Sequence, residues 1–121
     1  MELKEKLYLV DDQGEKFMGA GVLWLLEAIA RSKSLREAAK DMGLSYSKAY
    51  NMITKLEANL GHEIISRRHG GASREGAALT PYALSLIEIY KSFQERMKVH
   101  ANEEYKVFEK VLNRLEEDYN G

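Results

Sequence analysis

The side chains that could do chemistry form one polar row between Ser45 and Leu60. Apolar residues recur there at helical spacing, which predicts a helix with Ala49, Leu56 and Leu60 turned inward, together with Met52 or Ile53. The opposite face then carries hydroxyl, amide and ammonium groups, on Tyr46, Ser47, Lys48, Tyr50, Asn51, Thr54 and Lys55. Groups of this kind hydrogen-bond to base edges and pair with phosphates. The row therefore indicates a nucleic-acid ligand.

A shorter helix is predicted just before this row. Ser34 can cap its start, and Leu35, Ala38, Ala39 and Met42 give it one apolar side. Gly43 can take the left-handed conformation that ends a helix, and Ser45 can cap the next one. Two short helices joined by a tight turn, with small residues where they cross, are typical of a helix-turn-helix. An ordinary helical hairpin is the alternative.

Charge is distributed unevenly along the 121 residues, although the whole chain carries a net charge of only -1. Residues 31–81 hold nine Lys/Arg against five Asp/Glu, net +4, whereas residues 1–30 are at -3 and residues 82–121 at -2. A local basic patch is what phosphate contacts require. The predicted helix-turn-helix lies in the basic part.

A basic, glycine-rich loop follows the second helix. Residues 63–68 read as a short strand, and HGGASREG then leads to AALT. Two strands around such a loop predict a wing that contacts the DNA backbone or minor groove through Arg67, Arg68, His69 and Arg74. A plain surface hairpin is the alternative.

The N-terminal part is predicted to form a β-hairpin and a helix. Residues 3–10 and 15–18 are the strands, with Gly14 at a positive φ in the turn. A helix then runs to about Ser32, and Trp24 is expected in its core face because it sits among aliphatic residues. Gly19 and Gly21 lack the third glycine of a nucleotide-binding fingerprint.

Thr80 and Pro81 are a strong helix start, and no further Pro or Gly occurs before Gly121. Apolar residues then recur in two heptad-like seams whose phase shifts around residues 102–104, which indicates either a stutter in one helix or a break between two. We predict a DNA-binding domain over residues 1–81 and a dimerisation extension over residues 82–121. The extension would bury its stripe in a homodimer, through Leu86, Tyr90, Phe93, Met97, Phe108, Leu112 and Leu115. Folding of the stripe back onto its own domain is the alternative.

Other classes of chemistry find little support. The chain has no cysteine, its three histidines are far apart, and no nucleophile has an adjacent base, so we expect no enzyme, metal or cofactor. The charged start MELKEK is unlike a signal peptide, and the apolar run at residues 19–26 is far shorter than the ~20 residues of a membrane span. We therefore expect a soluble, cytoplasmic protein.

In order, these features resemble the N-terminal DNA-binding domain of the molybdate-responsive transcription regulators, the ModE family, and more distantly that of LysR-type regulators. The residues that carry the resemblance are Ala38-Ala39-Lys40, Gly43, Ser45-Tyr46, Ala49-Tyr50, Gly70-Gly71 and Ala78-Leu79-Thr80. Position 50 departs from the family pattern, with Tyr in place of the usual Trp. The chain also stops where family members of full length continue into a molybdate-binding β-domain, so molybdate sensing is not expected of these residues.

The resemblance implies a mainly α fold with a small β component, a winged helix-turn-helix that binds double-stranded DNA as a homodimer. Asn51 is the best candidate to read adenine, and Lys48 and Lys55 to hold phosphates. Tyr50 is expected either to touch a thymine methyl or to pack at the groove edge, with Ser45, Tyr46 and Ser47 beside it. A protein-interaction module and a non-specific DNA-binding protein are the alternatives. Control by a separate ligand-sensing subunit stays open.

Overall fold

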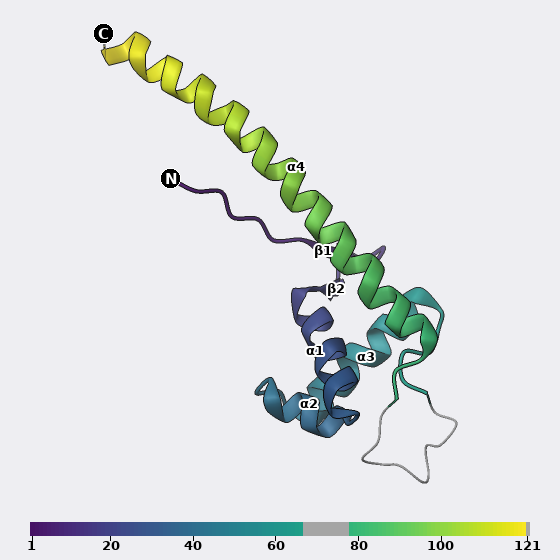
Figure 1. Cartoon of the computed structure of the whole chain (residues 1–121). Helices are drawn as coiled ribbons and strands as arrows, with labels where there is room; N and C mark the ends of the chain where they lie inside the picture. The colour runs from purple at the N-terminus through teal and green to yellow at the C-terminus, as the bar shows by residue number, and fades with distance from the viewer. Residues whose placement is uncertain (67–77, 121) are drawn as a thin grey trace. The chain divides into compact units, whose positions relative to one another are not determined.

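The computed structural model describes residues 1–66 and 78–120 (Figure 1). The elements in chain order are β1 (Tyr8–Val10), β2 (Lys16–Gly19), α1 (Ala20–Ser32), α2 (Leu35–Asp41), α3 (Tyr46–Leu60) and α4 (Pro81–Asn120). This is the predicted fold class, a mainly helical winged helix-turn-helix with an N-terminal β-hairpin and a long C-terminal helix. Residues Leu7–Tyr90 form one compact unit, and residues 1–6 with those from Lys91 onward form another.

The N-terminal hairpin is antiparallel, with Tyr8 opposite Gly19 and Leu9 opposite Met18. Its turn contains Gly14 at a φ of 82°, as predicted, because this conformation is open to glycine at little cost. The first strand is shorter than expected and begins at Tyr8.

The turn of the hairpin is held by a carboxylate. Asp11 Oδ1 accepts hydrogen bonds from the backbone N–H groups of Gln13 (2.9 Å) and Glu15 (3.0 Å). These bonds, the one from Glu15 first, lower the pKa of Asp11, and the nearby charge of Lys55 acts in the same direction. The carboxylate therefore stays ionised at neutral pH.

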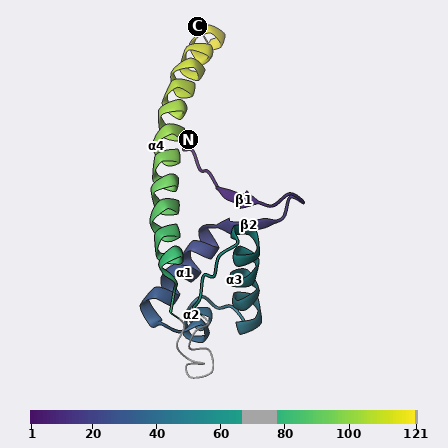
Figure 2. The same ribbon diagram turned by 90° about the vertical axis from the view of Figure 1, so that its right-hand side faces the viewer.

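The core lies where β2, α1, α2 and α3 meet, an arrangement that Figure 2 shows from the side. Its largest fully buried side chains are Met18, Leu25, Leu26, Ile29, Ile53, Leu56 and Ile64. Ala38, Ala39 and Ala49 are also buried, and their small side chains let α2 and α3 pack closely. The predicted role of the alanines in the helix pair is thus supported by their burial.

Trp24 is not in the core, contrary to the sequence-based expectation. Its side chain is 60% exposed, whereas the buried residues of α1 are Leu23, Leu25, Leu26, Ala28 and Ile29. These residues already fill the stripe of the helix that faces the core, and Trp24 lies outside it. An aliphatic neighbourhood in sequence did not mean an inward direction.

The C-terminal region is a single helix, α4. The phase shift between its two apolar seams is therefore not a break between two helices. Thr80 caps α4 by accepting a hydrogen bond from Ala83 N (3.1 Å), and its hydroxyl also donates to Glu63 O (2.7 Å). Ala83, Ile87 and Tyr90 are the buried residues of this helix. None of the described helices has the length and apolar character of a membrane span.

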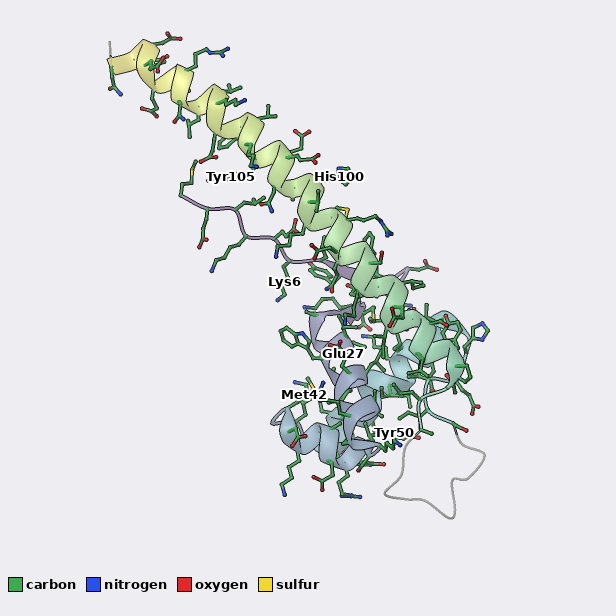
Figure 3. All side chains as sticks on the ribbon, in the orientation of Figure 1. Lys6, Glu27, Met42, Tyr50, His100 and Tyr105 are labelled. Carbon is green, nitrogen blue, oxygen red and sulfur yellow. The ribbon has the colours of Figure 1, made fainter. Side chains whose placement is uncertain are left out.

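The unit formed by residues 1–6 and the later part of α4 is mostly solvent-exposed. His100 and Tyr105 project from this part of the helix (Figure 3). Burial raises the pKa of Tyr105, and Glu109 and Glu2 raise it further. Large apolar side chains are exposed along the same stretch, on Met97, Val99, Val107, Phe108, Val111, Leu115 and Tyr119.

Candidate nucleic-acid interface

The turn between α2 and α3 is built from the predicted cap residues. Ser34 Oγ accepts a hydrogen bond from Glu37 N at the start of α2, and Ser45 Oγ accepts one from Lys48 N at the start of α3, both at 3.1 Å. Gly43 has a φ of 68°, and Leu44 N donates to Ala39 O (2.9 Å). Each cap satisfies a backbone donor that a helix end leaves unpaired. The start of α3 is therefore set by the local cap at Ser45.

Helix α3 buries one face and leaves the other in solvent. Its buried residues are Ala49, Ile53 and Leu56, so Ile53 and not Met52 occupies the inward position, while Leu60 is half-buried. Six of the predicted contact residues are exposed at the N-terminal end: Ser45, Tyr46, Ser47, Lys48, Tyr50 and Asn51. Thr54 and Lys55, further along, are half-buried. Tyr50 is labelled in Figure 3 on this helix.

An aromatic and cationic cluster covers the start of α3. The rings of Tyr46 and Tyr50 stack with centroids 6.2 Å apart and an interplanar angle of 27°. The guanidinium carbon of Arg36, on α2, lies 4.7 Å from the centroid of the Tyr46 ring, which is cation–π distance. Sequence reasoning missed Arg36 because ten positions separate it from Tyr46 and nothing local to α2 signals the contact.

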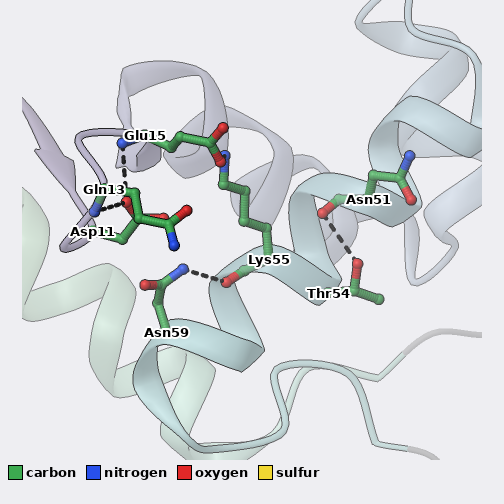
Figure 4. A network of polar contacts seen from close by, with 7 residues as sticks. All are labelled: Asp11, Gln13, Glu15, Asn51, Thr54, Lys55 and Asn59. Carbon is green, nitrogen blue, oxygen red and sulfur yellow. Dashed lines mark hydrogen bonds and ion pairs between the residues drawn. The ribbon is translucent and has the colours of Figure 1, made fainter.

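Lys55 is paired within the chain. Its ammonium lies 3.3 Å from Glu15 Oε2 in the β1–β2 turn, an ion pair between elements far apart in sequence. Figure 4 shows this part of the chain, in which Asn59 Nδ2 also donates to Lys55 O (2.9 Å) and Thr54 Oγ1 to Asn51 O (3.1 Å). A phosphate that binds Lys55 would therefore compete with the Glu15 carboxylate for the ammonium. Within the described residues nothing hydrogen-bonds to the side-chain amide of Asn51, which is open to a ligand.

The base of the predicted wing is held against α3. Ser66 N donates to Ala78 O and Thr80 N to Ile64 O, both at 2.9 Å, and Ile65 pairs with Leu79 in an antiparallel bridge. The segment that leads into this bridge is tied to α3, because Glu57 Oε2 accepts a hydrogen bond from Ile64 N at 2.8 Å. The predicted wing residues themselves, Arg67, Arg68, His69 and Arg74, lie outside the described residues.

The part of the chain that the structure describes holds no group of three His, Asp or Glu side chains that could bind a metal ion. The site of interest in the described residues is the capped, solvent-facing start of α3.

Comparison with known families gives a match over residues 22–84 to the model described as bacterial regulatory helix-turn-helix protein, lysR family. The chain belongs to this family. It is a helix-turn-helix DNA-binding domain of the LysR/ModE type.

The chain is also similar to transcription regulators named ModE. The chain is 39% identical over 66 residues to the DNA-binding transcriptional dual regulator ModE of Escherichia coli (strain K12), covering 54% of this chain and 25% of that protein. It is 30% identical over 101 residues to the transcriptional regulator ModE of Haemophilus influenzae, covering 84% of this chain and 39% of that one. The matched part thus spans only a quarter to two fifths of these relatives.

A solved structure of similar fold is the crystal structure of the CbnR_DBD–DNA complex. The TM-score is 0.57 at 22% sequence identity, over 74% of this chain and 98% of that chain. At this identity the likeness concerns the fold alone, and it agrees with the arrangement of helices described above.

Proposed function

We propose that this chain is a sequence-specific, double-stranded-DNA-binding transcription regulator that acts as a homodimer in the cytoplasm, by binding rather than by catalysis. The observation that carries the proposal is the capped start of α3, where polar and cationic side chains share one exposed face of a helix whose other face is core. A helix presented in this way fits the major groove of B-DNA.

The proposed contacts divide by chemistry. The amide of Asn51 can hydrogen-bond to both the donor and the acceptor that adenine presents in the major groove. Lys48, which lies one turn from the helix start, is proposed to hold a phosphate, and Lys55 to do so after exchange of its Glu15 partner. The remaining proposed contacts are Ser45, Tyr46, Ser47 and Tyr50 on α3, and Arg67, Arg68, His69 and Arg74 in the wing.

The proposed dimer face follows the exposed apolar residues of α4. Met97, Phe108, Val111 and Leu115 are each at least 37% exposed, and their successive spacings of 11, 3 and 4 residues place them on one side of the helix. Val111 was absent from the sequence-based set. Leu86, Phe93 and Leu112 are half-buried in the single chain. Tyr90 is only 4% exposed, so we place it in the core and not on the dimer face.

The proposal is tested by selecting bound duplexes from a random library and then measuring affinity against salt concentration on the best sequence. An enriched inverted repeat, with half-site centres about one helical turn apart, is expected. Lys48→Ala should lower the slope of log affinity against log salt by about 0.9, as for any lost phosphate contact. Weak binding without enrichment would overturn sequence-specific regulation and favour a protein-interaction module or a non-specific DNA-binding protein.

The dimer is tested by light scattering on the whole chain. Leu115→Glu should convert a dimer to a monomer, because it places a charge in the apolar stripe. Val99→Glu is the matched control, since Val99 is also exposed, at 47%, but lies on the opposite side of α4 from Phe108 and Leu115. If Leu115→Glu and Val99→Glu have the same mass in solution, the apolar stripe is not the dimer interface.

A further inference from the structure

Arg36 is a cation of α2 that the sequence did not single out. Its side chain is exposed, and its guanidinium carbon lies 4.7 Å from the centroid of the Tyr46 ring at the first residue of α3. Within the described residues this ring is its only specific partner, so no carboxylate neutralises it. Lys55 differs, because Glu15 holds its ammonium at 3.3 Å.

The cation–π contact leaves the hydrogen-bonding capacity of Arg36 unused. A guanidinium carries five N–H donors, and within the described residues those of Arg36 make no hydrogen bond. The donors therefore remain available to an acceptor approaching from solvent. A planar fork of donors matches the oxygens of a phosphate, to which arginine can bind through two parallel hydrogen bonds.

The contact with Tyr46 favours one position of that fork, because the ring centroid lies 4.7 Å from the guanidinium carbon. The Tyr46 ring stacks with Tyr50 one turn further along α3, and the Ser45 cap sets the first turn of the helix on which both rings stand. A long arginine side chain normally loses rotamer freedom when it binds, so holding it beforehand on a rigid ring lowers the entropic cost. The three residues link α2 to the end of α3 that carries Lys48 and Asn51.

We propose that Arg36 binds a backbone phosphate of the DNA duplex, and that Tyr46, supported by Tyr50, acts as the positioning residue for its guanidinium. This inference rests on the proposed DNA-binding function and adds a phosphate contact from the first helix of the pair. It also gives the tyrosines a definite role. Their rings orient a cation, in addition to any contact of their own with bases.

The test is the affinity of the full chain for its selected duplex, measured by fluorescence anisotropy between about 50 and 200 mM salt. Arg36→Ala should weaken binding at least about tenfold, the size of a charged hydrogen bond, and lower the salt slope by about 0.9. Arg36→Lys should keep the slope but bind about two- to fivefold more weakly, since an ammonium retains the charge and loses the planar fork of donors. Arg31→Ala is the matched control, because Arg31 lines an open groove between α1 and α4 and should leave both quantities unchanged.

The role of Tyr46 is tested by a double-mutant cycle. Tyr46→Phe keeps the ring and should retain the Arg36 effect, whereas Tyr46→Leu should reduce that effect by about two- to fivefold. Additive losses in the Arg36→Ala, Tyr46→Leu double variant would overturn the positioning role. Circular-dichroism melting of each variant checks that it is folded. If Arg36→Ala is not folded, Arg36→Lys takes its place in the affinity measurements.

Different results would refute the proposed DNA-binding function and the proposed Arg36 contact. If wild-type chain and Lys48→Ala both lack saturable binding, the proposed function itself is wrong. If Lys48→Ala loses affinity and slope while Arg36→Ala behaves as wild type, DNA binding stands and the Arg36 contact is refuted.

Discussion

Replacing Glu15 with Gln should strengthen DNA binding, because it releases Lys55 for a phosphate. The two charged atoms are 3.3 Å apart, and the side chains are 39% (Lys55) and 65% (Glu15) exposed. An exposed pair of this kind contributes about 0.2–1 kcal/mol after solvent screening and side-chain entropy. Where a phosphate replaces Glu15 at the ammonium, binding bears the cost of breaking the pair, so removal of Glu15 should tighten binding by a factor of up to about 1.4–5.

The assay compares Glu15→Gln with Asp12→Asn by anisotropy on one duplex at fixed salt. Asp12 is exposed in the same turn and has no ion-pair partner within the described residues, so its replacement measures the general effect of removing one negative charge. Lys55→Ala should then cost more affinity in the Glu15→Gln background than in the wild type. Equal gains for the two acidic variants, or a Lys55→Ala variant that binds normally, would refute Lys55 as a DNA contact.

Four further predictions concern the scaffold, each checked by the midpoint of urea unfolding unless stated otherwise. Ser45→Ala should destabilise the fold by about 1 kcal/mol through loss of the α3 cap, and Ser45→Thr should cost much less. Gly43→Ala should cost about 1–2 kcal/mol because its φ is 68° while the space around it is empty; an equal cost for Gly43→Asn would contradict a conformational cause. Ala39→Leu should destabilise by about 1–3 kcal/mol by forcing α2 from α3, and a neutral result would show that the contact can relax. The pKa of Asp11 is lowered in the fold, so its contribution to stability is present above the pKa of the unfolded chain and is lost as pH falls through the folded value; an NMR titration midpoint at or above the ordinary range of aspartate would refute this.

Local chemistry carried most of what the sequence predicted correctly. Ser34 and Ser45 cap helices, Gly14 and Gly43 have positive φ, and Thr80 with Pro81 starts α4, because each depends only on residues within a few positions. The unbroken helix after Pro81 follows equally from the lack of Pro and Gly. Periodicity located the inward face of α3 but could not choose between Met52 and Ile53.

Features that depend on tertiary contacts escaped the sequence. The pairing of Lys55 with Glu15 joins residues 40 positions apart, and the contact of Arg36 with Tyr46 joins two helices. Trp24 was assigned from its aliphatic neighbours on a predicted helix, and Tyr90 from helical spacing. Spacing shows which residues share a face, but which face meets the core is decided by neighbouring elements. Trp24 is exposed and Tyr90 buried for that reason.

Only the N-terminal part of the polar face of α3 is exposed and unpaired, which limits how many base pairs this helix could recognise. Its exposed polar residues run from Tyr46 to Asn51, while Lys55 beyond them is occupied by the acidic hairpin turn. Six residues of helix extend about 9 Å, which matches the rise of about three base pairs. In the proposed homodimer, two such half-sites would specify about six base pairs, a combination that random DNA contains about once in 4,000 positions, against the ~10⁶ or more competing sites of a genome. A selective regulator built on this domain must therefore obtain most of its discrimination elsewhere, from the minor groove beside the wing, from the shape of the spacer between half-sites, or from several operators occupied together.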